Sequence, residues 1–242
     1  MRQEPHLAPR PANHMPLTPV EFLVRAVEVH GDRPAVAWGE DTWTYRSFAR
    51  MVGRLARFLA AAGVRNVMAL RGDPSEGPRA PWTPTPGGFT YARELVELVR
   101  DRGGFDVGVA AFPEGHPSAD SLDADADVLV AKAEAGAAFA VTQMFFRAED
   151  YFGLVERVRA RGVDLPILPG IMPILNLAAI QRQGELIGTS VPDEIADRIQ
   201  ARADDPAAVR AEGIALAAEL CEELLAGGAP GLHFYTLNRS KA

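Results

Sequence analysis

The sequence predicts an α/β fold of the (β/α) barrel type, in which parallel strands alternate with helices that cover them. From Val64 onward, short apolar runs alternate with amphipathic segments in a regular order, which is typical of parallel strands covered by helices. Polar side chains also follow several successive apolar runs, as the catalytic face of a barrel requires. A doubly wound sheet would satisfy the alternation too, but no apolar run is followed by the GxGxxG motif of dinucleotide-binding sheets. We therefore favour the barrel.

Composition excludes several classes of function. The 242 residues carry a formal net charge of -7 without a basic stripe, so we expect no nucleic-acid partner. No apolar run is long enough to span a bilayer. The single cysteine, Cys221, excludes an internal disulfide or a cysteine-based metal site, and we interpret it as a core residue on a helix. We expect a cytoplasmic protein that binds neither a metal ion nor a membrane.

The first part of the chain is predicted to differ from the rest. Residues 1–16 show no periodicity and are expected to form a disordered tail. Residues 17–62 predict a helix that begins at Pro19, a small hairpin formed by the runs AVAW and TWTY around a Gly-Glu-Asp turn, and a second helix. The second helix is expected to end at Gly63, because glycine is the usual C-cap residue.

Residues 63–242 predict the barrel portion itself. Its helices are expected to alternate with near-continuous apolar strands. The strands are expected at NVMAL (66–70), DVGVAAF (106–112), FAVTQMFF (139–146), LPILPGIMPI (165–174) and LHFYTL (232–237). The helices are expected near residues 90–100, 123–134, 148–161, 177–184, 192–201 and 206–226.

Polar residues stand at the ends of these strands. Arg71-Gly72-Asp73 follows the first strand, Glu114 and His116 follow the second, Thr142-Gln143 lies in the third, and Asn238-Arg239 follows the last. The carboxyl ends of parallel strands meet at one edge of a sheet or barrel. The sequence therefore predicts one site at that edge.

These pieces resemble the methylenetetrahydrofolate reductase family. The segments GVRNVMALRGDP, APWTPTPGGFTYARELV, FDVGVAAFPEGHP, AGAAFAVTQMFF, PILPGIMPI, VPDEI and GLHFYTLNRS occur in the family's order and spacing. The resemblance covers roughly residues 63–242 and implies the fourth to eighth strand–helix units of an eight-unit barrel. The first three units, with the family's acidic Glu-Phe-Phe-Pro-Pro strand, have no counterpart in this sequence.

The resemblance also implies an activity. Members of the family pass hydride from NADH or NADPH through FAD to 5,10-methylenetetrahydrofolate, giving 5-methyltetrahydrofolate for methionine biosynthesis. A folate is then the expected small-molecule partner, and homo-oligomerisation is left open. Residues 17–62 instead resemble the amino-terminal segment of an adenylate-forming acyl-CoA synthetase. That family's phosphate-binding loop is absent from the sequence, so adenylation is the least supported function.

Individual roles follow from family positions. Asp73 is the implied catalytic residue, because a carboxylate beside the flavin and the folate can stabilise a cationic iminium form of the folate; the alternative is that it caps the following loop. Gln143 is placed for the edge of the pterin ring, and Arg239 for the substrate or the nicotinamide. The implied FAD contacts are Arg71, Gly72, Asp73, Ala92, Phe112, His116, Asp125 and Lys132.

Each of these assignments has a structural alternative. Taken singly, His116 would more often be a surface residue and Asp125 one member of a solvated helix face. Tyr235 is expected to pack in the last strand, with a stacking role as the alternative. Ala179 and Gln183 stand where the family commonly has Gln and Phe, which is expected to weaken substrate binding. Because the first three barrel units have no counterpart in the sequence, an inactive recombined or truncated fragment is the alternative to an active reductase.

Overall fold

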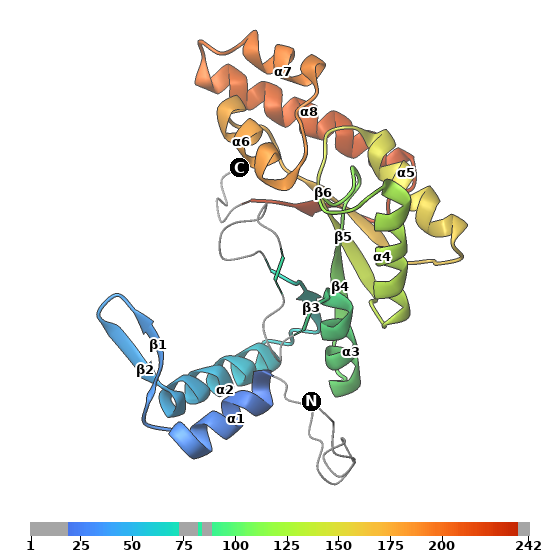
Figure 1. The fold of residues 1–242 in the computed structure, drawn as a ribbon. Coiled ribbons are helices and arrows are strands. Elements are labelled where there is room, and N and C mark those ends of the chain that lie inside the picture. Colours follow the sequence, from blue (N-terminus) through green and yellow to red (C-terminus); the bar gives the residue numbers. More distant parts are fainter. Residues whose placement is uncertain (1–18, 73–81, 84–88, 237–242) are drawn as a thin grey trace. The chain divides into compact units, whose positions relative to one another are not determined.

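The computed structural model describes residues 19–72, 82–83 and 89–236 of the chain (Figure 1). These residues form two compact units, the first made of residues 19–64 and the second of the remaining described residues. The predictions on Asp73 and Arg239 lie outside the described residues.

The first unit is a helix, a hairpin and a second helix. It contains α1 (Pro19–His30), β1 (Pro34–Trp38), β2 (Asp41–Thr44) and α2 (Tyr45–Ala61). The strands β1 and β2 pair antiparallel, and the turn between them includes Gly39 at a φ of 59°. After α2, Gly63 adopts a φ of 74° and the N–H of Val64 bonds the carbonyl of Leu59. This left-handed glycine ends the helix, because a residue with a Cβ would be strained there.

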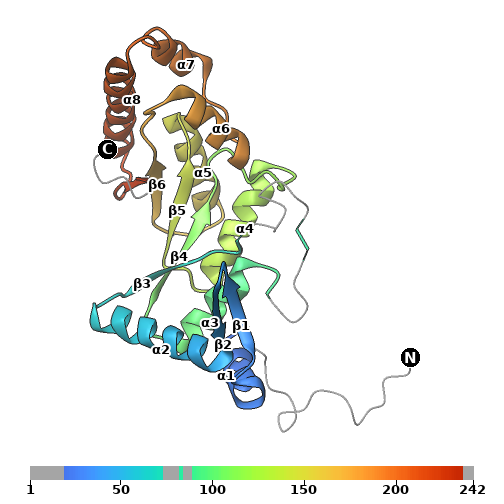
Figure 2. The ribbon, with the colours of Figure 1, turned by 90° about the vertical axis from the view of Figure 1, so that its left-hand side faces the viewer.

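The second unit is built on a curled parallel sheet (Figure 2). Its five strands are adjacent in the order in which they occur in the sequence, β3-β4-β5-β6-β7. A doubly wound sheet would reverse its strand order at a switch point, so the unreversed order indicates the barrel type. In the described part of the chain, β3 and β7 each have one neighbour, and the sheet does not close. The strands are β3 (Asn66–Ala69), β4 (Asp106–Ala111), β5 (Phe139–Met144), β6 (Ile167–Ile171) and β7 (His233–Phe234).

Six helices of the second unit connect these strands. Side-chain oxygens that accept backbone N–H groups start three of them, those of Ser121 for α4, Asn176 for α6 and Asp205 for α8. The helices are α3 (Ala92–Arg102), α4 (Leu122–Glu134), α5 (Ala148–Ala160), α6 (Leu177–Ile187), α7 (Asp193–Gln200) and α8 (Pro206–Ala226).

Two strands are shorter than expected. The run 165–174 forms β6 only over Ile167–Ile171, and in the described part of the last run, residues 232–236, only two residues form β7. Proline lacks the N–H that a ladder needs, and Pro166 and Pro173 flank β6. β6 ends at Ile171, whose carbonyl accepts the N–H of Tyr235, and among the described residues the pairing with β7 does not continue beyond that point.

The two faces of the sheet carry different side chains. Val107, Val109, Ala140 and Ile167 belong to a buried core that includes side chains of α3, α4, α5 and α8. On the opposite face, Gly108 makes room for its neighbours, since a Cβ there would lie 2.5 Å from both Met68 Sδ and the Phe139 ring. The register of β3, β4 and β5 places these residues side by side.

A second apolar cluster packs α6, α7 and α8 beyond the carboxyl ends of β5 and β6. Gly213 of α8 lies so close to the chain that an added Cβ would be 1.7 Å from the carbonyl oxygen of Ile174. Glycine is therefore required at this helix contact. The buried members of the cluster are Met144, Ile174, Ile180, Ile199 and Val209.

Candidate functional site

The carboxyl ends of β3, β4 and β5 bring most of the predicted site residues to one edge of the sheet. Arg71 and Gly72 follow β3 after one intervening residue, Leu70, and Phe112 directly follows β4. Gln143 is the penultimate residue of β5, and Ala92 is the first residue of α3. Since a helix that connects two parallel strands starts at the carboxyl edge of the first one, Ala92 belongs to the same edge as Arg71.

Helix α4 presents a carboxylate and an ammonium group to this edge. Asp125 and Lys132 are seven residues apart, so they lie on the same face of the helix. The Nζ of Lys132 donates a hydrogen bond of 2.9 Å to the carbonyl oxygen of Ala110 in β4. Asp125 is only 9% exposed, and its carboxylate accepts the backbone N–H of His116. Asp125 is therefore not a member of a solvated helix face, and it ties the loop after β4 to α4.

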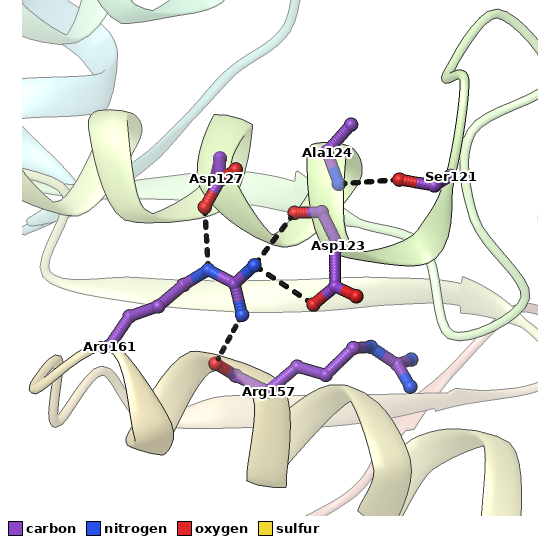
Figure 3. A network of polar contacts seen from close by, with 6 residues as sticks. All are labelled: Ser121, Asp123, Ala124, Asp127, Arg157 and Arg161. Atoms are coloured by element: carbon purple, nitrogen blue, oxygen red, sulfur yellow. Dashed lines mark hydrogen bonds and ion pairs between the residues drawn. The ribbon is translucent and has the colours of Figure 1, made fainter.

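The outer face of α4 is held by α5 (Figure 3). The guanidinium of Arg161 donates to the carboxylates of Asp123 and Asp127 and to the carbonyl oxygen of Asp123. Its Nη1 also bonds the carbonyl of Arg157. These contacts leave the opposite face of α4, with Asp125 and Lys132, directed toward the strand ends.

Burial shifts the pKa values of both groups on the inner face of α4. Burial raises the pKa of Asp125, and the positive charge of Lys132 and the interactions with His116 only partly oppose this. Burial lowers the pKa of Lys132; the nearby Asp125 opposes this, and the positive charge of Arg71 adds to it. Two cations, Arg71 and Lys132, thus lie within electrostatic range of each other with Asp125 as the buried carboxylate. Such an arrangement favours an anionic ligand.

The loop after β4 orients an aromatic pair. The rings of Phe112 and His116 meet edge to face with centroids 4.8 Å apart. The Nδ1 of His116 accepts the backbone N–H of Ser118 at 3.0 Å, which fixes the orientation of the imidazole. His116 is half-buried, so it is not the exposed surface residue that the sequence alone favours.

Arg71 contacts a residue that sequence reasoning missed. Its Cζ lies 4.4 Å from the centroid of the Trp82 ring, in the loop between β3 and α3. The indole Nε1 of Trp82 is buried and has no hydrogen-bond partner in the part of the chain that the structure describes. Trp82 stands in a proline-rich stretch, and no periodicity there could have marked it.

Gln143 lies on the same face of β5 as Phe139 and Val141, and this face points away from the helices. Its Oε1 accepts the backbone N–H of Met144 at 3.0 Å, which orients the amide. Tyr235 follows β7 and donates from its hydroxyl to the carbonyl of Thr142 at 2.8 Å. Burial raises the pKa of Tyr235, so this residue is a neutral structural hydrogen-bond donor, in agreement with the packing interpretation.

Glu114 is a second group of the loop after β4. Burial raises the pKa of its carboxyl group, a hydrogen bond with the Thr189 side chain opposes this, and Asp150 adds to it. The loop also meets the turn after α6 at Gly188, where an added Cβ would lie 2.7 Å from Pro117. The loop after β4 is therefore braced from two sides, by α4 and by the turn after α6.

The described residues lack two kinds of feature. None of the described helices combines the length and the apolar character that crossing a bilayer requires. The same residues contain no group of three or more His, Cys, Asp or Glu side chains suited to a metal ion.

Comparison with known proteins gives a consistent result. The model of the methylenetetrahydrofolate reductase family matches residues 44–242. Methylenetetrahydrofolate reductase 1 of Schizosaccharomyces pombe is 40% identical over 182 residues, covering 74% of this chain and 30% of the relative. Methylenetetrahydrofolate reductase 2 of Saccharomyces cerevisiae is 40% identical over 186 residues, covering 75% and 31%. The 5,10-methylenetetrahydrofolate reductase of Escherichia coli is 35% identical over 179 residues, covering 74% and 58%. The chain thus spans less than two thirds of these relatives.

Proposed function

The chain belongs to the methylenetetrahydrofolate reductase family, and we propose that it binds FAD at the carboxyl ends of β3, β4 and β5 and supports reduction of 5,10-methylenetetrahydrofolate with NADH or NADPH. The observation that carries the proposal is the placement of Lys132 and Asp125 on the inner face of α4, beside Arg71 and the loop after β4.

The residues at this edge fit a flavin dinucleotide. Arg71 and Lys132 supply positive charge for a diphosphate, and the buried carboxylate of Asp125 suits ribitol or ribose hydroxyls. The edge-to-face pair of Phe112 and His116 offers aromatic surface beside them. Ala92 starts α3 at the same edge, where the carboxylate of Glu94 accepts the N–H groups of Thr90 and Tyr91 and so fixes the start of the helix.

When bound, FAD supplies the hydride transfer between the nicotinamide and the folate. The chain's own groups then bind and orient. Gln143 presents an amide that can donate and accept along the edge of a pterin. Asp73, the next residue after Gly72, provides the carboxylate that favours a cationic folate. Arg239 binds the substrate or the nicotinamide. The roles of these three residues are proposals from their family positions.

We further infer two origins for the chain. The segment 17–62 derives from an adenylate-forming acyl-CoA synthetase, and residues 63–242 form the reductase-like barrel portion. The family match begins at residue 44, inside the first segment, so the helix α2 is common to both assignments. Replacing residues 17–43 alone tests this division. If these residues lie outside the reductase-like portion, the protein should keep its affinity for FAD after the replacement.

Flavin binding is the decisive experiment. The purified chain is titrated with FAD and followed by the visible spectrum, and NADH oxidation is then measured with a quinone acceptor. We expect a structured flavin band and turnover. A site variant, His116→Gln, removes one ring of the aromatic pair and should weaken FAD binding without abolishing the fold. A protein that stays colourless at high micromolar FAD would exclude the reductase function.

One observation favours the alternative, a chain without catalytic activity. Among the described residues the sheet ends at β3, and Met68 on this strand is 42% exposed. A parallel sheet normally has both faces covered. Flavin binding without NADH oxidation would support this alternative, whereas oxidation with the quinone acceptor would exclude it.

A further inference from the structure

The contact between Arg71 and Trp82 has an unusual electrostatic setting. Arg71 is exposed, and in the described residues it forms no ion pair. Its positive charge is nevertheless near enough to Lys132 to lower the pKa of that ammonium group. Two neighbouring cations repel each other, and a long exposed arginine would ordinarily turn its guanidinium into solvent. A contact with another side chain must therefore keep the guanidinium of Arg71 near Lys132.

The ring of Trp82 supplies this restraint. The guanidinium lies 4.4 Å from the ring centroid, and tryptophan is the best of the aromatic side chains for attracting a cation to its face. Arginine also stacks on aromatic planes while its N–H groups at the rim remain available to a ligand. The contact thus fixes the position of Arg71 without using its hydrogen-bond donors.

The indole N–H indicates that a ligand completes the arrangement. Nε1 of Trp82 is buried and unpartnered within the described ranges. A buried indole N–H usually has an acceptor, because an unmade hydrogen bond is costly. An anion held by Arg71 would bring acceptor oxygens to this region.

We propose that Trp82 is a positioning residue of the anion site, and that its ring holds the guanidinium of Arg71 against the phosphate groups of the bound ligand. The inference rests on the proposed function in one respect: the ligand is taken to be FAD, with its diphosphate as the anion.

The contact itself can be tested without flavin. Trp38 and Trp43 are the other two tryptophans of the chain, and replacing both with phenylalanine leaves Trp82 as the only indole emitter. In this background Arg71→Gln should shift the emission and raise acrylamide quenching, because the ring loses its cover. Arg93→Gln, which removes an exposed arginine at the start of α3, should change neither. Identical emission and quenching with and without Arg71 would overturn the proposal.

The positioning role is tested by a double-mutant cycle on FAD affinity, measured by quenching of flavin fluorescence. Trp82→Leu should weaken binding roughly threefold to thirtyfold, the range of a cation–π contact. Trp82→Phe keeps a ring and should fall between the wild type and the leucine variant. The Arg71→Gln/Trp82→Leu double variant should bind no more weakly than Arg71→Gln alone, because Trp82 acts through Arg71.

The outcomes separate this inference from the proposed function. Losses that add in the double variant, or equal affinities of the wild type and Trp82→Leu, overturn the positioning role while flavin binding stands. If the wild type binds no FAD, inorganic pyrophosphate serves as the probe, with isothermal titration calorimetry as the readout. Pyrophosphate binding that is weakened alike by Arg71→Gln and by Trp82→Leu upholds the positioning role although the flavin function has failed. Pyrophosphate binding that neither variant changes overturns it.

Discussion

The ammonium group of Lys132 lies 2.9 Å from the carbonyl oxygen of Ala110, so α4 is bonded through its inner face to the end of β4. Because the charge sits beside the proposed diphosphate position, Lys132→Met should weaken FAD binding roughly tenfold to a hundredfold, the range of a hydrogen bond to a charged group. Isothermal titration with FAD measures the loss. Lys241→Met, which removes the chain's other lysine, is the control and should bind as the wild type does. Equal loss in both variants would contradict the assignment.

Asp125 should make the stability of the apoprotein depend on pH. Burial raises the pKa of its carboxyl group above the ordinary 3.8, so the folded state keeps this proton to a higher pH than the unfolded state. The free energy of unfolding therefore falls as the pH rises from 3.8 through the raised pKa. Asp125→Asn has no such fall. In urea unfolding across this pH range, the free energy of unfolding of Asp125→Asn should rise relative to that of the wild type as the pH rises. A difference in this free energy that is independent of pH would refute the prediction.

Thr142 should be a stability determinant of the sheet. Its hydroxyl is fully buried and accepts the N–H of Gly170 at 2.8 Å. Thr142→Val removes the acceptor and leaves a buried N–H unpaired, which should cost about 1–3 kcal/mol of unfolding free energy. The control is Thr42→Val on the exposed part of β2. Chemical denaturation measures both, and an unchanged midpoint for Thr142→Val would show that another group satisfies Gly170.

Gly213 should not tolerate a side chain. An alanine Cβ there would meet the carbonyl oxygen of Ile174, a backbone atom that cannot turn away. We expect Gly213→Ala to destabilise the second unit by at least about 1–3 kcal/mol. Gly53→Ala in α2 is the matched control, since its Cβ would lie 3.5 Å from a flexible Arg57 nitrogen. The control should gain up to about 1 kcal/mol of helix propensity. Thermal unfolding followed by circular dichroism distinguishes the opposite signs.

The Arg161 network should contribute little to stability despite its four hydrogen bonds. The carboxylates of Asp123 and Asp127 are 72% and 67% exposed, and exposed ion pairs contribute about 0–1 kcal/mol. Arg161→Met should therefore leave the midpoint of urea denaturation almost unchanged. A much larger loss in urea denaturation would mean that the network fixes the position of α4.

The pattern of the sequence was sufficient for most of the second unit. The sheet side chains Val107 and Val109 face the helices and belong to near-continuous apolar runs, which is the pattern of a parallel strand. The six helices were recognisable from their apolar spacing, and the structure places all of them within a few residues of the expected ranges. Prediction was less successful where the length of a strand depends on its partner. Among the described residues β7 pairs with β6 only as far as Ile171, and the sequence of the run itself does not show this.

The site was only partly predictable. Arg71, Gly72, Phe112, His116 and Gln143 could be placed because they stand at or near the ends of strands. The burial of Asp125 could not, since it depends on the loop after β4 folding back onto α4. Trp82 was missed altogether, because its contact with Arg71 is tertiary and its neighbours carry no periodic pattern. The roles of the predicted site residues, including Asp73 and Arg239, stay predictions.

The order of the sheet has a consequence for how the protein forms. Each strand from β4 to β7 pairs with the strand that precedes it along the chain, so the sheet can grow in the order in which the residues are synthesised. The hydrogen bond from the Tyr235 hydroxyl to the Thr142 carbonyl instead joins residues 93 positions apart, and such distant contacts form late because long loops must close first. The hydrogen bond from Tyr235 therefore stabilises β5 only after the last strand has been added to the sheet.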